Sequence, residues 1–196
     1  MLYVGLTGGI GSGKTLAGKI LSTLGTPVFN ADDETKKCYE HDPALRAKLT
    51  ALLGNDIYCD GQLQRPVMAA KIFADVSLLT RVEALVHPLI MTRFFRYAAE
   101  QQAPCVVLEA AILFESGIGQ QMHRTIVIQA PEAIRIQRVM ARDNVDEATV
   151  RQRMKHQWSD EQRAARADFI VTNDGQQPLL PQLQTINRQL QLATNR

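Results

Sequence analysis

Cysteine is scarce in this chain, and its arrangement excludes two common uses of the residue. Among 196 residues there are three cysteines, Cys38, Cys59 and Cys105, and none of them forms a Cys-x-x-Cys pair. A scattered and odd-numbered set is typical of reduced thiols in a cytoplasmic protein. The sequence therefore predicts neither a disulfide framework nor a zinc site.

Long apolar runs and an excess of one charge sign are also absent. No stretch approaches the ~20 apolar residues of a membrane-spanning helix, and the run 105–114 is interrupted by Glu109. The 22 basic and 20 acidic residues leave a net charge of +2, so neither nucleic acid nor a membrane is expected as the main partner. No obligate protein partner is evident. We also expect no signal peptide, because the motif described next begins at the eighth residue.

A glycine-rich motif is the most specific feature that the sequence does contain. Residues 8–15 read Gly-Gly-Ile-Gly-Ser-Gly-Lys-Thr, a complete phosphate loop of the form G-x-x-x-x-G-K-[ST]. An apolar run precedes it and a helix-like stretch at 16–24 follows it, which is the order that phosphate binding requires. Lys14 would reach the β- and γ-phosphates, and the Thr15 hydroxyl would ligate Mg²⁺. A glycine-rich turn before a helix is the alternative, and it does not account for all the fixed positions.

Short apolar runs rich in Val and Ile alternate with helical patterns along the chain. Such runs are typical of buried parallel strands. The alternation predicts an α/β fold with a mostly parallel sheet and helices on both faces. The expected strands are 2–7, 27–29, 105–108, 125–129 and 169–171.

Residues from about 31 to 102 contain no convincing buried strand. Helices are expected at 44–53, 66–74 and 78–99, with turns at Gly54 and at Asp60-Gly61. In a phosphotransfer enzyme, a helical insertion at this place suits binding of the acceptor, and a purely structural cap is the alternative. Further helices are expected at 131–142, at 146–158 with Asp146 as N-cap, and at 178–193.

Acidic residues follow two of the expected strands. Asp32 and Asp33 come directly after the second strand, where a carboxylate could accept a proton from a substrate hydroxyl. Capping of a helix is an equally good interpretation of these two residues. Glu109 ends the third strand, where many phosphate-loop proteins place a carboxylate that organises Mg²⁺. Glu115 is a weaker candidate for such a role, and helix capping or ion pairing is the alternative.

Three arginines share one face of the helix expected at 131–142. Arg135, Arg138 and Arg142 are spaced three and four residues apart. A guanidinium group is suited to stabilising charge on a transferring phosphoryl group, whereas on an arbitrary helix a solvated basic face is the alternative. We expect Arg138 and Arg142 to act ahead of Arg135.

Three more polar positions are ambiguous by themselves. Arg65 comes just before an expected helix, and His87, followed by Pro88, is interpreted as opening a long helix. Asn173 follows the last expected strand in a turn, on the sheet edge where a nucleotide base could rest.

Together, these landmarks resemble one family, the dephospho-CoA kinases. The opening segment 5–15 is similar to the start of that family almost residue for residue, and the later landmarks follow in the family's order up to about residue 175. These landmarks are Asn30-Ala31-Asp32, Arg65, His87-Pro88-Leu89-Ile90, Leu113-Phe114-Glu115, Arg138 to Asp143, Gln157 and Ala167 to Asn173.

The resemblance implies an activity and an organisation. It implies a cytoplasmic kinase that uses ATP and Mg²⁺ to phosphorylate the ribose 3′-hydroxyl of dephospho-CoA, the last step of CoA biosynthesis. It further implies a single domain with a P-loop NTPase-like core at about 1–30, 103–130 and 167–196. A helical acceptor-binding insertion would occupy about 31–102, and a small helical lid about 131–166.

The resemblance also assigns roles to matching residues. Asp32 would be the catalytic base, and that role concentrates on Asp32 because Asn30 stands where the family has another acid. Lys14, Arg138 and Arg142 would be catalytic, the two arginines on the lid. Arg65 and His87 would bind the acceptor together with Asp32, and Thr15 and Glu109 would hold the metal. The expected ATP-binding residues are Gly11, Ser12, Gly13, Lys14, Thr15, Leu16 and Asn173.

Other classes of nucleotide-binding protein are alternatives. Another small-molecule or nucleoside monophosphate kinase of the same fold would differ mainly in its helical insertion. A regulatory nucleotide switch is disfavoured, because no late strand is followed by an Asn/Thr-Lys-x-Asp motif. A non-catalytic module would have no need of Lys14, Thr15, Asp32 and the lid arginines together.

Overall fold

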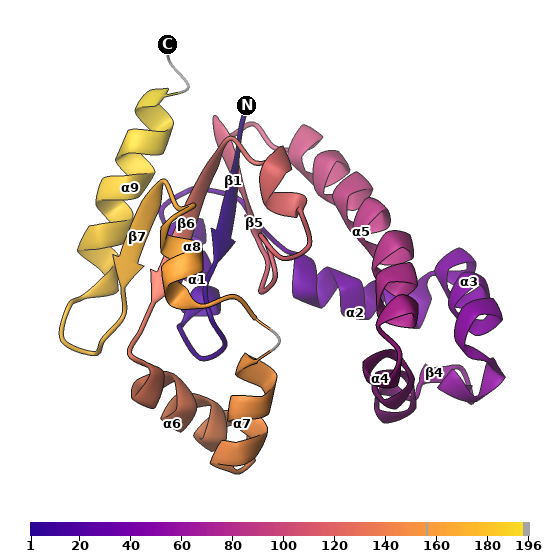
Figure 1. Cartoon of the computed structure of the whole chain (residues 1–196). Coiled ribbons are helices and arrows are strands. Elements are labelled where there is room, and N and C mark those ends of the chain that lie inside the picture. Colours follow the sequence, from indigo (N-terminus) through magenta and orange to yellow (C-terminus); the bar gives the residue numbers. More distant parts are fainter. Residues whose placement is uncertain (156, 194–196) are drawn as a thin grey trace. The chain divides into compact units, whose positions relative to one another are not determined.

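The chain forms two compact units in the computed structural model, which describes residues 1–155 and 157–193. The first unit comprises Met1–Asn30 and Tyr97–Arg196, and the second comprises Ala31–Arg96. Figure 1 shows the helices and strands of both. Among the described helices, none combines the length and the apolar character needed to cross a membrane.

A five-stranded sheet is the framework of the first unit, with strand order β2-β5-β1-β6-β7. All its strand pairs are parallel, which confirms the predicted fold class. Each strand predicted from the sequence forms, within one residue of the expected bounds. The strands are β1 (Leu2–Thr7), β2 (Val28–Asn30), β5 (Cys105–Glu109), β6 (Arg124–Gln129) and β7 (Phe169–Thr172).

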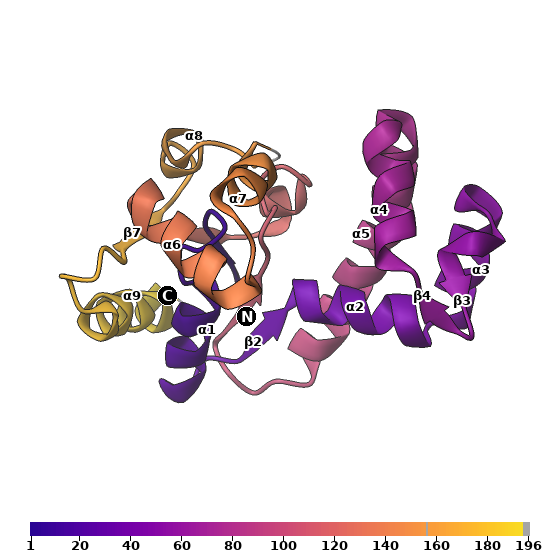
Figure 2. The ribbon, with the colours of Figure 1, turned by 90° about the horizontal axis from the view of Figure 1, so that it is seen from below.

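Both faces of this sheet are covered. Helices α1 (Lys14–Thr23) and α9 (Leu179–Ala193) lie side by side on one face (Figures 1 and 2). There Leu6 of β1, Leu21 of α1 and Leu183 of α9 are fully buried in one cluster. The other face carries segment 110–122, which includes the 3₁₀ helix η2 (Ile118–Gln121), and α8 (Asp160–Ala164), which contacts β6. Because Leu113 closely approaches Gly5 of β1, there is no room for a side chain at that position.

Two more helices follow β6 in the first unit. They are α6 (Glu132–Asp143) and α7 (Glu147–Met154). Asp146 caps α7 by accepting a hydrogen bond from Thr149 N, as predicted. The helix predicted at 146–158 is wrong at its C-terminal end, because α7 ends at Met154. The Ser159 side chain then starts a separate helix, α8, through a capping box with Gln162.

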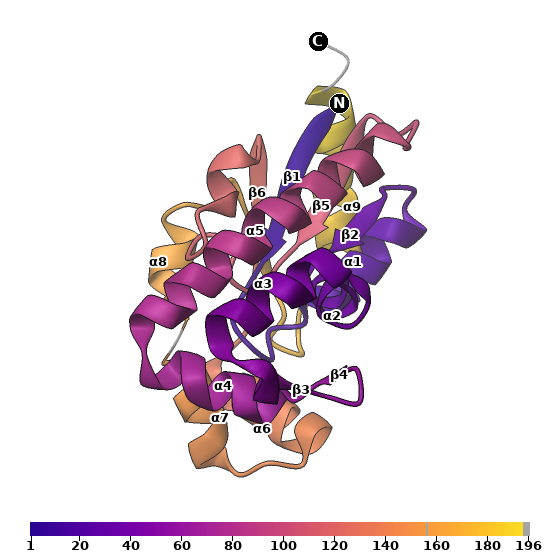
Figure 3. The same ribbon diagram turned by 90° about the vertical axis from the view of Figure 1, so that its right-hand side faces the viewer.

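The second unit is mainly helical (Figure 3). No buried strand is expected here, and the structure adds an unpredicted hairpin of two-residue strands that turns at Asp60-Gly61, where the sequence predicts a turn. Strands this short and exposed carry no hydrophobic period that a sequence could display. The elements are α2 (Ala31–His41), α3 (Pro43–Leu53), η1 (Asn55–Ile57), β3 (Tyr58–Cys59), β4 (Gln62–Leu63), α4 (Arg65–Ala74) and α5 (Val76–Ala99), which ends in the first unit.

The interpretation of His87 as the start of a helix is wrong. Helix α5 begins at Val76 and continues through Pro88. A proline inside a helix removes one backbone hydrogen bond. The helix persists because apolar residues on both sides of the proline, Val86 and Ile90, are buried in the core.

An arginine of α5 joins both ends of α2. Arg93 donates hydrogen bonds to Glu34 Oε1 at 2.7 Å and to Asp42 Oδ2 at 3.0 Å. Burial would raise the pKa of Glu34, but hydrogen bonds from Arg93 and Lys37 outweigh it, so the pKa is lowered. The pKa of Asp42 is lowered mainly by the backbone N–H of Leu45 and further by Arg93. The helix that begins next to Asp32 is therefore held at both its ends.

Candidate active site

The phosphate loop connects the carboxyl end of β1 to the first turn of α1. Gly11 and Gly13 have φ angles of 78° and 98°, in the left-handed region that favours glycine. A side chain at Gly13 would also collide with Asn173, since a Cβ atom would lie 2.3 Å from its Nδ2. Gly13 is the N-cap of α1 and makes no side-chain cap hydrogen bond. The helix therefore presents its N-terminal N–H groups and dipole to an anion.

The two residues expected to hold a metal lie next to each other. Thr15 Oγ1 donates a hydrogen bond of 2.9 Å to Glu109 Oε1. Glu109 is only 3% exposed, and Asn30 Nδ2 donates to its other oxygen at 3.2 Å. The strand register explains this meeting, because Glu109 is the partner of both Leu6 in β1 and Asn30 in β2. Both oxygens of this buried carboxylate therefore accept a hydrogen bond from a side chain.

Oxygen atoms of this kind are the ligands that Mg²⁺ prefers. The described part of the chain contains no group of three or more His, Cys, Asp or Glu residues that could hold a metal. Mg²⁺ sites at phosphate loops typically combine one or two protein oxygens with substrate phosphates and water. The Thr15–Glu109 pair fits that pattern.

Arg138 and Asn173 connect the phosphate loop to α6 and to the end of β7. Asn173 Nδ2 donates to Ser12 O at 2.7 Å, and the side chain is buried. Arg138 donates to Gly11 O at 3.4 Å, and to the backbone and side-chain oxygens of Asn173 at 3.3 and 3.4 Å. Arg138 and Asn173, both predicted for the site, therefore contact each other and the phosphate loop. Lys14 Nζ lies within the loop as well and donates to Gly8 O at 3.0 Å.

The other two arginines of α6 differ in their surroundings. Arg142 is bonded to the adjacent Asp143 at 2.7 and 3.1 Å, and its side chain is 63% exposed. Arg135, which we ranked lower, is 7% exposed. Its guanidinium group lies against the loop, because a Cβ atom at Gly9 would lie 2.1 Å from Arg135 Nη1. The structure thus brings Arg135 and Arg138 to the loop, but not Arg142.

Leu16 is exposed in α1 of the first unit, and the predicted acceptor-binding residues belong to the second unit. Asp32 is exposed in the first turn of α2, beside Asp33 and Glu34. Arg65 begins α4 and donates to Glu40 at 3.2 Å. His87 lies within α5, and burial lowers the pKa of its imidazole, only partly offset by Glu83.

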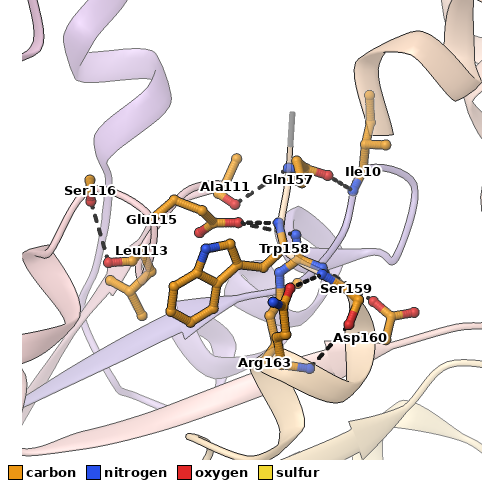
Figure 4. A network of polar contacts seen from close by, with 12 residues as sticks. Ile10, Ala111, Leu113, Glu115, Ser116, Gln157, Trp158, Ser159, Asp160 and Arg163 are labelled. Carbon is orange, nitrogen blue, oxygen red and sulfur yellow. Dashed lines mark hydrogen bonds and ion pairs between the residues drawn. The ribbon is translucent and has the colours of Figure 1, made fainter. Parts of the chain in front are cut away.

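The structure also brings Gln157, one of the family landmarks, to the phosphate loop. Gln157 Oε1 accepts a hydrogen bond of 2.8 Å from Ile10 N (Figure 4). Glu115 accepts from Trp158 N at 2.9 Å and from Arg163 Nη2 at 3.3 Å. These partners are far apart along the chain, and no local pattern in the sequence marks them as neighbours.

The first strand of the parallel sheet runs through a glycine-rich loop into a helix, and a buried carboxylate is bonded to the loop threonine. This arrangement defines a phosphate-loop protein of the α/β class. The family model for dephospho-CoA kinase matches residues 2–178. The chain belongs to the dephospho-CoA kinase family, and its class is therefore that of a kinase.

Individual relatives agree with this assignment. A protein of Porphyromonas gingivalis named dephospho-CoA kinase is 41% identical over 184 residues, which span 93% of this chain and 91% of that protein. The crystal structure of TT1252 from Thermus thermophilus has a TM-score of 0.87 at 30% identity, covering 96% of this chain and 97% of that one. A dephospho-CoA kinase from Campylobacter jejuni has a TM-score of 0.67 at 20% identity, covering 97% and 98%, and supports the fold alone.

Proposed function

We propose that the chain transfers the γ-phosphoryl group of ATP to the ribose 3′-hydroxyl of dephospho-CoA, giving CoA and ADP. The observation that carries this proposal is the phosphate loop with Thr15 bonded to Glu109, in a chain of the dephospho-CoA kinase family. We place the reaction in the cytoplasm, in keeping with three free cysteines, and with neither nucleic acid nor a membrane as partner.

The first unit supplies the ATP site. Backbone N–H groups from Gly11 to Leu16 would hold the phosphates at the N-terminus of α1. Lys14 and Arg138 would offset the negative charge that develops on the moving phosphoryl group. Asn173, already bonded to Ser12 O at 2.7 Å, would lie near the adenine. The segment from about 131 to 166 would serve as the lid, with Arg142 acting from it.

Thr15 and Glu109 would hold Mg²⁺ at this site. The observed pair of oxygen donors fits a hard cation, and the burial of Glu109 would hold its carboxylate in one place. When bound, the ion would neutralise charge on the β- and γ-phosphates. Thr15 and Glu109 would keep that ion beside the phosphate loop that carries Lys14.

The second unit would bind the acceptor. Asp32 would accept the proton of the 3′-hydroxyl, because an exposed carboxylate in the first turn of a helix is accessible to substrate. Arg65 and His87 would contact the acceptor as well. The lowered pKa of His87 keeps its ring neutral near pH 7, so it would act by hydrogen bonding and not as a cation.

Coupled ADP release tests the proposal. The assay contains ATP and Mg²⁺, with and without dephospho-CoA, and the mass of the product is recorded. Acceptor-dependent ADP release with a mass gain of one phosphoryl group is the expected result. Absence of turnover with dephospho-CoA, while ATP still binds, would overturn the assigned acceptor and direct the search to nucleoside monophosphates and other small hydroxyl metabolites.

A further inference from the structure

Two buried guanidinium groups lie against the phosphate loop at Gly9. Arg163 is 1% exposed and Arg135 is 7% exposed. A Cβ atom at Gly9 would lie 2.1 Å from Arg135 Nη1 and 3.5 Å from Arg163 Nη1. The backbone at Gly9 is therefore packed directly against the arginines, and only glycine leaves them room.

Asp160 and Glu115 hold these arginines in place. Asp160 bridges the two, with Oδ2 at 3.1 Å from Arg135 Nη2 and Oδ1 at 3.2 Å from Arg163 Nη1. Glu115 accepts from Arg163 Nη2 at 3.3 Å (Figure 4). Two cations and two anions balance formally, which buried charges require. Loss of the bridging carboxylate would leave the arginines at Gly9 without their shared partner.

Gln157 forms a hydrogen bond with Ile10, the residue that follows Gly9 in the phosphate loop. Gln157 Oε1 accepts from Ile10 N at 2.8 Å, and its Nε2 donates to Ala111 O at 3.4 Å. One side chain therefore joins the phosphate loop to the segment that follows Glu109. Figure 4 shows Gln157 lying between Ile10 and Ala111.

We infer that segment 157–163, here called the loop clamp, fixes the backbone of Gly9 and Ile10, and that Gln157 and Asp160 are positioning residues for the phosphate loop. The inference rests on the proposed binding of nucleotide at this loop. A glycine-rich loop has many accessible conformations, and ordering it upon binding would weaken affinity. The loop clamp orders the phosphate loop before the nucleotide binds. Neither residue touches the substrate in this role.

Four variants test the inference by equilibrium binding of ADP and AMP. Gln157→Leu removes both hydrogen bonds at nearly constant volume, and Asp160→Asn removes the charge that the arginines share. Gln137→Leu, at an exposed position of α6, is the matched control. We expect each clamp variant to weaken ADP binding about tenfold. AMP binding should change much less, because AMP lacks the β-phosphate that the loop holds, and the KM for ATP should rise with kcat little changed. Trp158→Phe is the fourth variant.

Trp158, the one tryptophan of the chain, gives a second readout. It follows Gln157 and stacks on Phe114, with ring centroids 5.8 Å apart. ADP should change tryptophan fluorescence in the wild type, and this change should be lost in Gln157→Leu. Trp158→Phe confirms the source of the signal.

The possible outcomes separate the inference from the proposed function. Wild-type protein that fails to bind ADP would contradict the proposed function. Wild-type protein that binds ADP, with both clamp variants binding like Gln137→Leu, would overturn the inference alone. Circular dichroism and urea unfolding accompany each variant. If Gln157→Leu does not fold, Asp160→Asn decides; loss of folding in both would also overturn the inference, since the segment would then serve the fold and not the loop.

Discussion

A single methyl group at Gly18 should disturb the proposed metal site. Gly18 lies within α1, where replacing glycine by alanine ordinarily stabilises a helix by about 1 kcal/mol. Here, however, the new Cβ atom would lie 2.9 Å from Glu109 Oε2 and 3.5 Å from Val28 Cγ1. The φ angle of Gly18 is not in the positive region, so the conflict comes from packing and not from backbone strain.

The gain in helix propensity is opposed by the loss of hydrogen bonding at Glu109. The Glu109 carboxylate must move by several tenths of an ångström within a pocket that leaves it 3% exposed. That movement weakens its bonds to Thr15 and Asn30, at 2.9 and 3.2 Å. A hydrogen bond to a charged group contributes about 1.5–3 kcal/mol. Loss of one such bond exceeds the gain in helix propensity, so we expect Gly18→Ala to lower the free energy of unfolding by about 0.5–2 kcal/mol.

Two measurements check this expectation. Urea unfolding gives the change in the free energy of unfolding. ADP titrations with and without Mg²⁺ give the factor by which Mg²⁺ strengthens ADP binding, and this factor should fall about tenfold. Ser22→Ala, at an exposed position of the same helix, is the control for helix propensity alone. A Gly18→Ala protein that is about 1 kcal/mol more stable and keeps its full Mg²⁺ dependence would refute the reasoning.

Three further predictions concern other residues. Asp32→Asn should lower kcat by about 10²-fold or more with ATP affinity little changed, because a general base is lost; near-normal turnover would move that role, Glu109 being next. Arg142→Ala should reduce kcat more than nucleotide affinity in steady-state assays, and an equal loss in both would indicate ground-state binding. Arg93→Met should lower the free energy of unfolding by about 1–2 kcal/mol at pH 7, measured in urea, because two charge-assisted hydrogen bonds disappear. The pKa values of both carboxyl partners are lowered in the folded protein. Their contribution is therefore complete above about pH 5 and lost as pH falls through the lowered values, so a stability difference that does not shrink as pH falls below about 4 would contradict the assignment.

The strands and the Thr15–Glu109 pair were predictable because they depend on local patterns and one topological rule. Each strand is a short apolar run, and the carboxyl ends of parallel strands meet at one sheet edge. Glu109 ends its strand at the edge where the phosphate loop begins, which brings it within 2.9 Å of Thr15. Sequence position alone was sufficient for that contact.

The order of the arginines was not predictable in the same way. Helical spacing places Arg135, Arg138 and Arg142 on one face, but it does not say which of them another segment covers. Arg135 is buried because Gly9 has no side chain and because Asp160, in a different helix, pairs with it at 3.1 Å. Arg142 instead pairs with its chain neighbour, Asp143. Both outcomes depend on tertiary contacts that leave no period in the sequence.

The position of β1 in the sheet has a consequence for how the chain folds. β1 lies between β5 and β6, and its register places Leu2 opposite Cys105 and Val4 opposite Arg124. The central strand therefore has no local partner, and residues 31–96 form a compact unit of their own within the intervening chain. Pairing across such a separation costs the entropy of closing a long loop before any contact between the strands stabilises it. The second unit is continuous in sequence, so it can form early in folding. The nucleotide-binding sheet forms only after segments far apart in the sequence have come together.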